Sequence, residues 1–211
     1  MYQAIVLLPL LGAVVAGGIA LWGAYQRHPG ADPAPGAEDH ASPPVLEDRP
    51  RAAPSPPGTS SVIRHSTTEP EQHAPPAEGS RAAEIITTGL LFVSWGLSLI
   101  AFYAVGFGHR TERVPLFTWF TSGDLKVDWS LRIDSLTVVM LVVVTTVSAL
   151  VHLYSIGYMR EDPYRPRFFA YLSFFTFAML ALVTSDNLAQ LFFGWEGVGL
   201  ASYLLIGFWY H

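Results

Sequence analysis

The sequence predicts an all-α membrane protein with about five transmembrane helices, a disordered Pro-rich insert and a short surface β-hairpin. Several windows of about 20 apolar residues have the length that a bilayer-spanning helix needs. Residues 26–83 hold 12 of the 16 prolines and almost no large apolar side chains, which is typical of a disordered linker. The stretch "LKVDWSLRI" alternates apolar and polar residues, as a half-buried strand does.

The apolar windows predict spans over residues 4–25, 85–107, 134–158, 167–185 and 187–209. The chain then divides into a first helix in 1–25, a linker in 26–84, a second helix in 85–107, a hairpin in 108–133 and three further helices in 134–211. The first span lacks the preceding positive charge of a secretory signal, so we expect it to be retained. The chain stops at His211 directly after the last span, and we expect a truncation there.

Composition excludes several functions. The net charge of −5, without any basic run, does not indicate nucleic-acid binding. The absence of cysteine excludes disulfides, thiol catalysis and Cys-ligated metals. The histidines of the linker are dispersed, so they do not preorganise a metal site. We therefore predict neither a metal site nor a nucleic-acid partner.

The arginines predict the orientation in the lipid bilayer. Arg160, Arg165 and Arg167 lie in or beside the short connection between the third and fourth spans, and short cytoplasmic connections are enriched in Lys and Arg. We therefore expect this connection, the linker and His211 inside a cell membrane, and the N-terminus and hairpin outside. The acidic residues of the linker weaken this asymmetry.

One carboxylate stands out in the fifth span. In "FFGWEGVGLASYLLIGFW", residues 192–209, only Glu196 is charged, and it falls roughly 13–15 Å into the predicted helix. A charge at that depth costs at least about 2.5–3.5 kcal/mol, so such residues usually serve ion or proton paths. Glu196 is therefore a candidate proton relay; the alternative is a protonated hydrogen-bonding group that holds helices together. Asp186 is expected to cap the start of this helix.

Two further residues are candidate helpers. Tyr203 shares a helical stripe with Glu196 and Gly199, so its hydroxyl is expected on the same side. His152, in the third span, is either a second relay group or a hydrogen-bonded packing residue. Apart from Arg167 at the first position of the fourth span, no Lys or Arg falls inside a predicted span, so a cation facing Glu196 must come from another polypeptide or from sequence beyond this chain.

Two stretches resemble a known family. "SDNLAQLFFGWEGVGLASYLLIGFW", residues 185–209, and "LRIDSLTVVMLVVVTTVSALVHLYSIGYM", residues 131–159, are similar to the largest antiporter-like membrane subunits of respiratory complex I, the subunit L family of NADH-quinone oxidoreductases. The resemblance extends from about residue 116 to the end. The connection between the first two helices is short in the family, and here it is a long insert.

The resemblance implies a function that the residues alone leave open. Glu196 would be the family's membrane glutamate in a first half-channel for protons, coupled to a lysine on a later, interrupted helix. The chain would hold part of a larger antiporter-like bundle in a bacterial inner membrane, beside other complex I membrane subunits. NADH and quinone would act elsewhere, and this chain would hold no cofactor. The alternatives are a subunit of a sodium–proton antiporter or membrane-bound hydrogenase, or a non-catalytic membrane scaffold.

Overall fold

The computed structural model describes residues 1–27, 80–108 and 111–209. Most of the predicted linker, residues 28–79, lies outside the described residues, as does His211. The described elements, in chain order, are α1 (Tyr2–Arg27), α2 (Ser80–Ala101), the π-helical turn η1 (Phe102–Gly106), β1 (Glu112–Ser122), β2 (Leu125–Ile133), α3 (Ser135–Tyr158), α4 (Arg165–Val183) and α5 (Leu188–Ile206).

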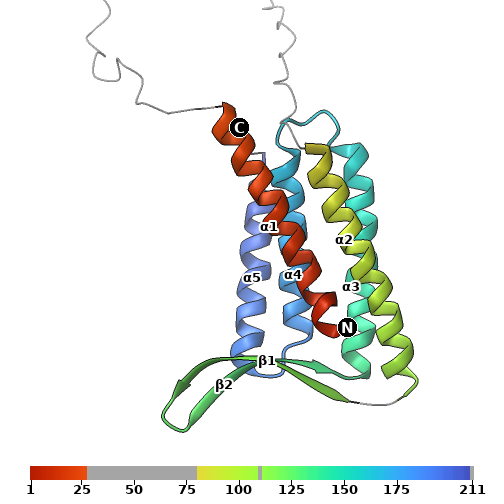
Figure 1. Ribbon diagram of the computed structural model, residues 1–211, viewed down its shortest axis with the longest axis vertical. Helices are drawn as coiled ribbons and strands as arrows, with labels where there is room; N and C mark the ends of the chain where they lie inside the picture. The colour runs from red at the N-terminus through yellow and green to blue at the C-terminus, as the bar shows by residue number, and fades with distance from the viewer. Residues whose placement is uncertain (28–79, 109–110, 210–211) are drawn as a thin grey trace, which may run out of the picture.

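The α-helices form a bundle, and the hairpin crosses one end of it (Figure 1). In the described residues, five helical segments are long and apolar enough to cross a membrane. The predicted fold class, with its helices and its two-stranded hairpin, is therefore confirmed. The N-terminus lies at the hairpin end, whereas the α3–α4 connection lies at the opposite end, beside the start of α2 (Figure 1).

Side chains at the helix starts explain where α3 and α5 begin. Asp134 caps α3, because its Oδ1 accepts a hydrogen bond from the backbone N–H of Thr137 at 2.9 Å. Helix α5 begins after Asn187, whose Oδ1 accepts from the backbone N–H of Gln190 at 2.9 Å. This corrects the expectation for Asp186: the adjacent amide performs the capping.

The hairpin pairs β1 with β2 in antiparallel register. Gly123 lies in the turn with φ +58°, a conformation that costs glycine little because it has no Cβ. Val127, Leu131 and Ile133 are buried, as the alternation predicts. Ser130 is buried as well, against the alternation, because it bonds to the start of α5, as described below.

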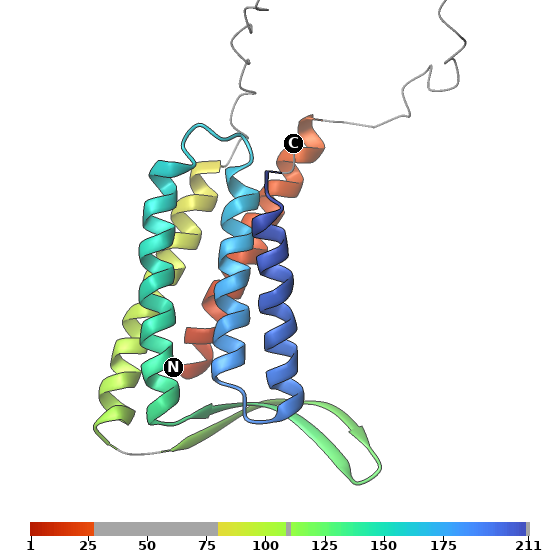
Figure 2. The same cartoon turned by 180° about the vertical axis from the view of Figure 1, so that it is seen from behind.

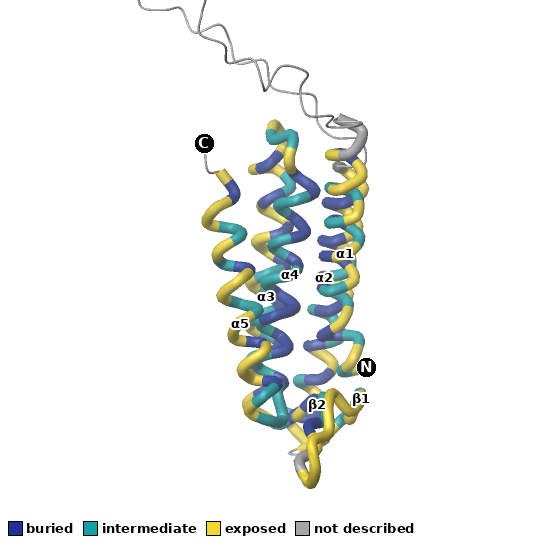
Figure 3. Tube along the Cα trace, turned by 90° about the vertical axis from the view of Figure 1, so that its left-hand side faces the viewer, coloured by how far each residue is buried: buried dark blue, intermediate teal, exposed yellow. Residues whose placement is uncertain are grey.

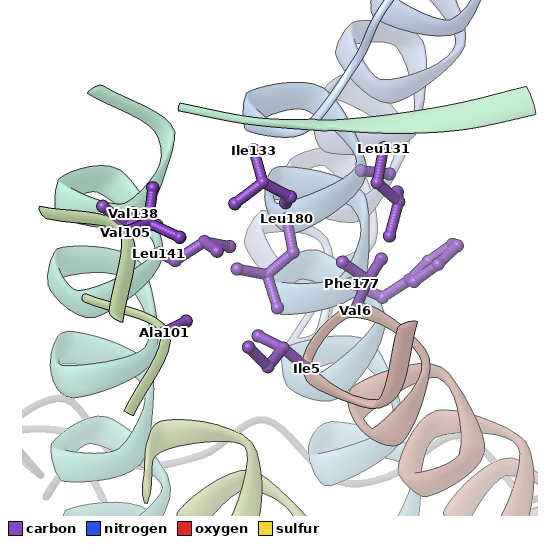
Figure 4. Packing of buried hydrophobic residues seen from close by; sticks show 11 residues of the cluster. Ile5, Val6, Ala101, Val105, Leu131, Ile133, Val138, Leu141, Phe177 and Leu180 are labelled. Atoms are coloured by element: carbon purple, nitrogen blue, oxygen red, sulfur yellow. The ribbon is translucent and has the colours of Figure 1, made fainter. Parts of the chain in front are cut away.

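The main hydrophobic core lies at the hairpin end of the bundle (Figure 4). Leu131 and Ile133 of β2 pack there against the ends of the helices. The remaining buried members come from the four helices other than α5 and from η1: Ile5, Val6, Ala101, Val105, Val138, Leu141, Phe177, Leu180 and Ala181. The backbone N–H of Arg132 also donates to the carbonyl of Thr184 at 2.9 Å, so β2 is joined to the end of α4.

Helix α5 stands at one side of the bundle and carries long exposed stretches (Figure 3). Only 17% of its most apolar window is buried, against 50% for α4. Helix α4 is therefore central, and α5 is peripheral among the described elements.

Candidate functional site

The start of α5 is fastened to the hairpin by polar side chains. Asp186 accepts from Ser130 Oγ at 3.1 Å, and its Oδ1 lies 3.2 Å from Arg113 Nε. Asn187 Nδ2 donates to the carbonyl of Asp128 at 2.7 Å. Gln190, which is fully buried, accepts from the backbone N–H of Ser130 through Oε1 at 3.2 Å. The helix that carries Glu196 is therefore anchored to β2.

The small residues of α5 allow close contact with α4. A Cβ added at Gly194 would lie 2.7 Å from the backbone N and Cα of Leu182, which is too close for any residue but glycine. A Cβ at Gly197 would lie 3.1 Å from the Cβ of Ala178. Ala201 is fully buried. These positions form the α4-facing side of α5, as the small-xxx-small spacing of Gly197 and Ala201 predicts.

Glu196 lies on the other side of α5 and is exposed in the described structure. It is the only charged residue between Leu188 and Ile206. It lies near the middle of the helix, about 12 Å from its start at the rise of an α-helix. Among the described residues, no cationic side chain lies within ion-pair distance of its carboxylate.

Tyr203 and Gly199 are exposed on the same helix, as the predicted stripe requires. Tyr203 is 74% exposed, and open space surrounds the Cα of Gly199, since a Cβ there would meet nothing within 4 Å. Bulky apolar side chains flank them: Phe192 and Trp195 are 60% and 66% exposed. The face therefore combines one acid, one hydroxyl and large apolar groups, which suits an apolar surrounding better than water.

His152 is in a different place. It is fully buried between α3 and α4, where Nδ1 lies 2.9 Å from the carbonyl of Ser148 and Nε2 lies 3.0 Å from Ser173 Oγ. Because a carbonyl oxygen only accepts, Nδ1 donates to Ser148, and in the neutral ring Nε2 accepts from Ser173. Helix α4 lies between α3 and α5 (Figure 2), so the structure brings Tyr203 onto the face of Glu196 but not His152.

A buried ion pair was missed at the sequence level. Arg165 Nη1 lies 2.8 Å from Glu84 Oε1, and the side chains are 7% and 5% exposed. The predicted spans 85–107 and 167–185 exclude both residues, yet α2 begins at Ser80 and α4 at Arg165. The charges can enter the helices because each compensates the other. A pairing across 81 residues of sequence leaves no local signal in one sequence.

The described residues contain no group of three or more His, Asp or Glu side chains that could hold a metal ion. A carboxyl group such as that of Glu196 can take up and release a proton, and the Tyr203 hydroxyl lies on the same exposed face of α5. Proton transfer would require a charged or polar partner beside Glu196.

Comparison with known proteins gives this arrangement a context. The family model described as "NADH-Ubiquinone oxidoreductase (complex I), chain 5 N-terminus" matches residues 119–169, which include most of the hairpin and α3. Glu196 lies outside this match. NADH-quinone oxidoreductase subunit L of Rhodobacter capsulatus is 59% identical over 137 residues, which cover 62% of this chain and 19% of that relative. Over these residues the chain is similar to the N-terminal region of the subunit L and chain 5 family.

Other relatives agree. NADH-ubiquinone oxidoreductase chain 5 of Arabidopsis thaliana is 58% identical over 132 residues, covering 63% of this chain and 20% of the relative. Subunit L of Rickettsia conorii is 53% identical over 130 residues, covering 62% and 20%. The family resemblance in the sequence is thus confirmed. The chain spans about a fifth of the length of these subunit L and chain 5 relatives.

Proposed function

We propose that the chain is part of a proton-translocating membrane subunit of an NADH:quinone oxidoreductase, and that Glu196 carries a proton in it. The observation that carries the proposal is the isolated carboxylate near the middle of an otherwise uncharged apolar helix, in a chain similar to the subunit L family. Intramembrane carboxylates of this kind usually serve proton or ion paths, because an unused charge at that depth is costly.

The proposed step at Glu196 is a reversible proton transfer. A cation that approaches the carboxylate favours its charged form and releases the proton, whereas withdrawal of the cation favours uptake. The cation would come from residues outside the described structure. Tyr203 is the nearer candidate helper, because its hydroxyl can both donate and accept on the same exposed face. His152 would serve Glu196 only through groups that cross α4, of which Ser173 is the first.

The proposed partners are the lipid bilayer and the other membrane subunits of complex I. The redox chemistry of NADH and quinone would take place in those other parts, and this chain would respond to it by moving protons. In a bacterium, the subunit would lie in the inner membrane, with the N-terminus and the hairpin outside and the linker in the cytoplasm. The position of the N-terminus and hairpin at the same end of the bundle supports this arrangement (Figure 1).

The test is the variant Glu196→Gln in the full-length protein within its complex. Proton pumping and NADH oxidation are measured together in sealed membrane vesicles. We expect the ratio of protons to electrons to fall, because the amide has a similar shape but cannot release a proton. Glu161→Gln is the matched control, since Glu161 is an exposed carboxylate in the α3–α4 connection.

Unchanged pumping in the Glu196→Gln complex would refute the relay and favour a scaffold in which Glu196 is only a hydrogen-bonding group. Loss of cation transport without any link to NADH oxidation would instead favour an antiporter subunit. A complex that does not assemble would be recognised on a native gel, and Glu196→Asp then tests the relay with the acid retained.

A further inference from the structure

An apolar groove lies between α1 and α4 at the bundle end opposite the hairpin, where α1 ends and α4 begins (Figure 1). Its volume is about 330 Å³. We call it the α1–α4 groove, and its apolar walls are formed by Gly17, Ala20, Leu21, Ala24, Pro166 and Ala170. Most of these side chains are small, so the groove is a shallow channel along the two helices.

One cation borders this groove. Arg167 also lines it, and its guanidinium lies over the rings of Tyr164 and Phe208, 4.9 and 4.8 Å from their centroids. Nη2 donates to the carbonyl of Phe208 at 3.3 Å. The stacking fixes the guanidinium in place, so little side-chain entropy remains to be lost on binding.

The charge of Arg167 has no acidic partner in the part of the chain that the structure describes. Its Nε is buried and makes no hydrogen bond there. Asp162, an acid of the α3–α4 connection, already accepts hydrogen bonds from the indole N–H of Trp209 at 2.9 Å and from the backbone N–H of Tyr164. Arg167 is therefore a preoriented cation beside an apolar channel, at the end of a membrane-spanning helix.

From this arrangement we propose that the α1–α4 groove binds an anionic phospholipid. Its phosphate would accept hydrogen bonds from Arg167, and one acyl chain would lie along the small residues of α1 and α4. A guanidinium matches a phosphate in charge and geometry. A basic group between transmembrane helices at the membrane surface is the usual setting for an anionic headgroup. A free phosphate ion would bind Arg167, but it would not account for the apolar walls of the α1–α4 groove.

The level of Arg167 in the bilayer supports the same occupant. Tyr158 and Trp209 lie at this end of the bundle, with their rings in contact, and such rings are common at the height of lipid headgroups. The phosphate of a phospholipid would meet Arg167 at that height, with its acyl chains directed toward the bilayer centre. This site is independent of the proton path proposed for Glu196.

The first experiment uses a photoreactive residue. Benzoylphenylalanine replaces Leu21, which lines the groove and is 75% exposed, in the full-length protein. The protein is placed in vesicles of equal amounts of phosphatidylglycerol and phosphatidylcholine, and the lipid adducts are identified by mass spectrometry. We expect phosphatidylglycerol adducts to exceed phosphatidylcholine adducts by about five-fold, the factor expected from one basic side chain near a membrane surface.

Paired variants then separate the headgroup from the acyl chain. Arg167→Gln is expected to abolish the preference for phosphatidylglycerol, whereas Arg160→Gln, which removes an exposed arginine of the same connection, is expected to keep it. Gly17→Leu fills the groove and is expected to lower adducts of both lipids. Gly18→Leu makes the same change at a neighbour that is exposed and does not line the groove, and it should leave them unchanged.

Three results would overturn the proposal. Equal labelling of the two lipids in the parent protein would remove the headgroup contact. Adducts to peptide instead of lipid would show that protein covers the groove. Equal effects of Gly17→Leu and Gly18→Leu would show that the channel holds no acyl chain. The lipid preference is a ratio measured within each sample, so reduced yield of a variant does not affect it.

Discussion

Asp134 connects the hairpin to α3 and also sets where that helix begins. Its carboxylate accepts from both the backbone N–H and the hydroxyl of Thr137, at 2.9 and 3.0 Å, and its other oxygen lies 3.3 Å from Arg132 Nε. The Thr137 N–H is the main reason that the pKa of Asp134 lies below its usual 3.8, with smaller contributions from the Thr137 hydroxyl and Arg132, while partial burial opposes the shift.

A pH-dependent contribution to stability follows from this lowered pKa. Because the folded protein binds this proton less readily than the unfolded chain, the stabilisation is fully present above pH 3.8 and is lost as the pH falls through the native pKa. Asp134→Asn keeps the cap but does not titrate. We measure the free energy of unfolding in detergent at about pH 5 and about pH 3. We expect it to fall in the parent by more than in the Asp134→Asn variant, with a difference of at most about 1 kcal/mol. Identical pH profiles would show that Asp134 contributes nothing.

At the scale of elements, the contact between α4 and α5 determines how α5 presents Glu196. Gly194 brings α5 close to the backbone of Leu182, and Gly197 lies against Ala178. Glu196 and Gly199 are then directed away from α4. The glycine-rich sequence of α5 thus determines both which face packs against α4 and which face is exposed.

Gly194→Ala is expected to weaken this contact. The added Cβ would lie 2.7 Å from backbone atoms of Leu182, which cannot move aside as a flexible side chain could. Overpacking of this kind costs about 1–3 kcal/mol. Gly199→Ala is the control, because its Cβ would meet nothing within 4 Å and alanine favours the helix. The apparent melting temperature of the detergent-solubilised protein should fall for Gly194→Ala alone; equal values would contradict the close approach.

At the scale of the molecule, the pair of Glu84 and Arg165 joins the second turn of α2 to the first turn of α4. These helices lie on either side of α3 in the chain, and their starts meet at the end opposite the hairpin (Figure 1). The main core lies at the hairpin end, so the ion pair stabilises the end that this core does not reach.

Removing one partner should cost more than removing both. Glu84→Gln or Arg165→Gln leaves a buried charge without compensation, which typically costs about 3–5 kcal/mol. The double variant has two neutral amides that can hydrogen-bond to each other. We expect it to melt at a higher temperature than either single variant in the full-length protein. Strictly additive losses in this double-mutant cycle would show that the two charges are not coupled.

Much of this architecture could be predicted from the sequence, because apolar windows and strand alternation are local patterns. They indicated the spans, the hairpin and the stripe shared by Glu196, Gly199 and Tyr203. The cap expected at Asp186 was wrong and the Glu84–Arg165 pair was missed, because both depend on contacts between residues that are distant in the chain. Asp186 and Asn187 are both good capping residues, and only the position of Arg113 and Ser130 directs Asp186 to the hairpin. The cation that we expect to face Glu196 stays a prediction.

The bonds between β2 and α5 have a consequence for the position of Glu196. Asn187 and Gln190 each hold a backbone group of the hairpin, so α5 cannot slide along its axis by even one residue, about 1.5 Å, without losing both. The height of the Glu196 carboxylate along the bundle is thus set relative to the hairpin by this pair of polar contacts.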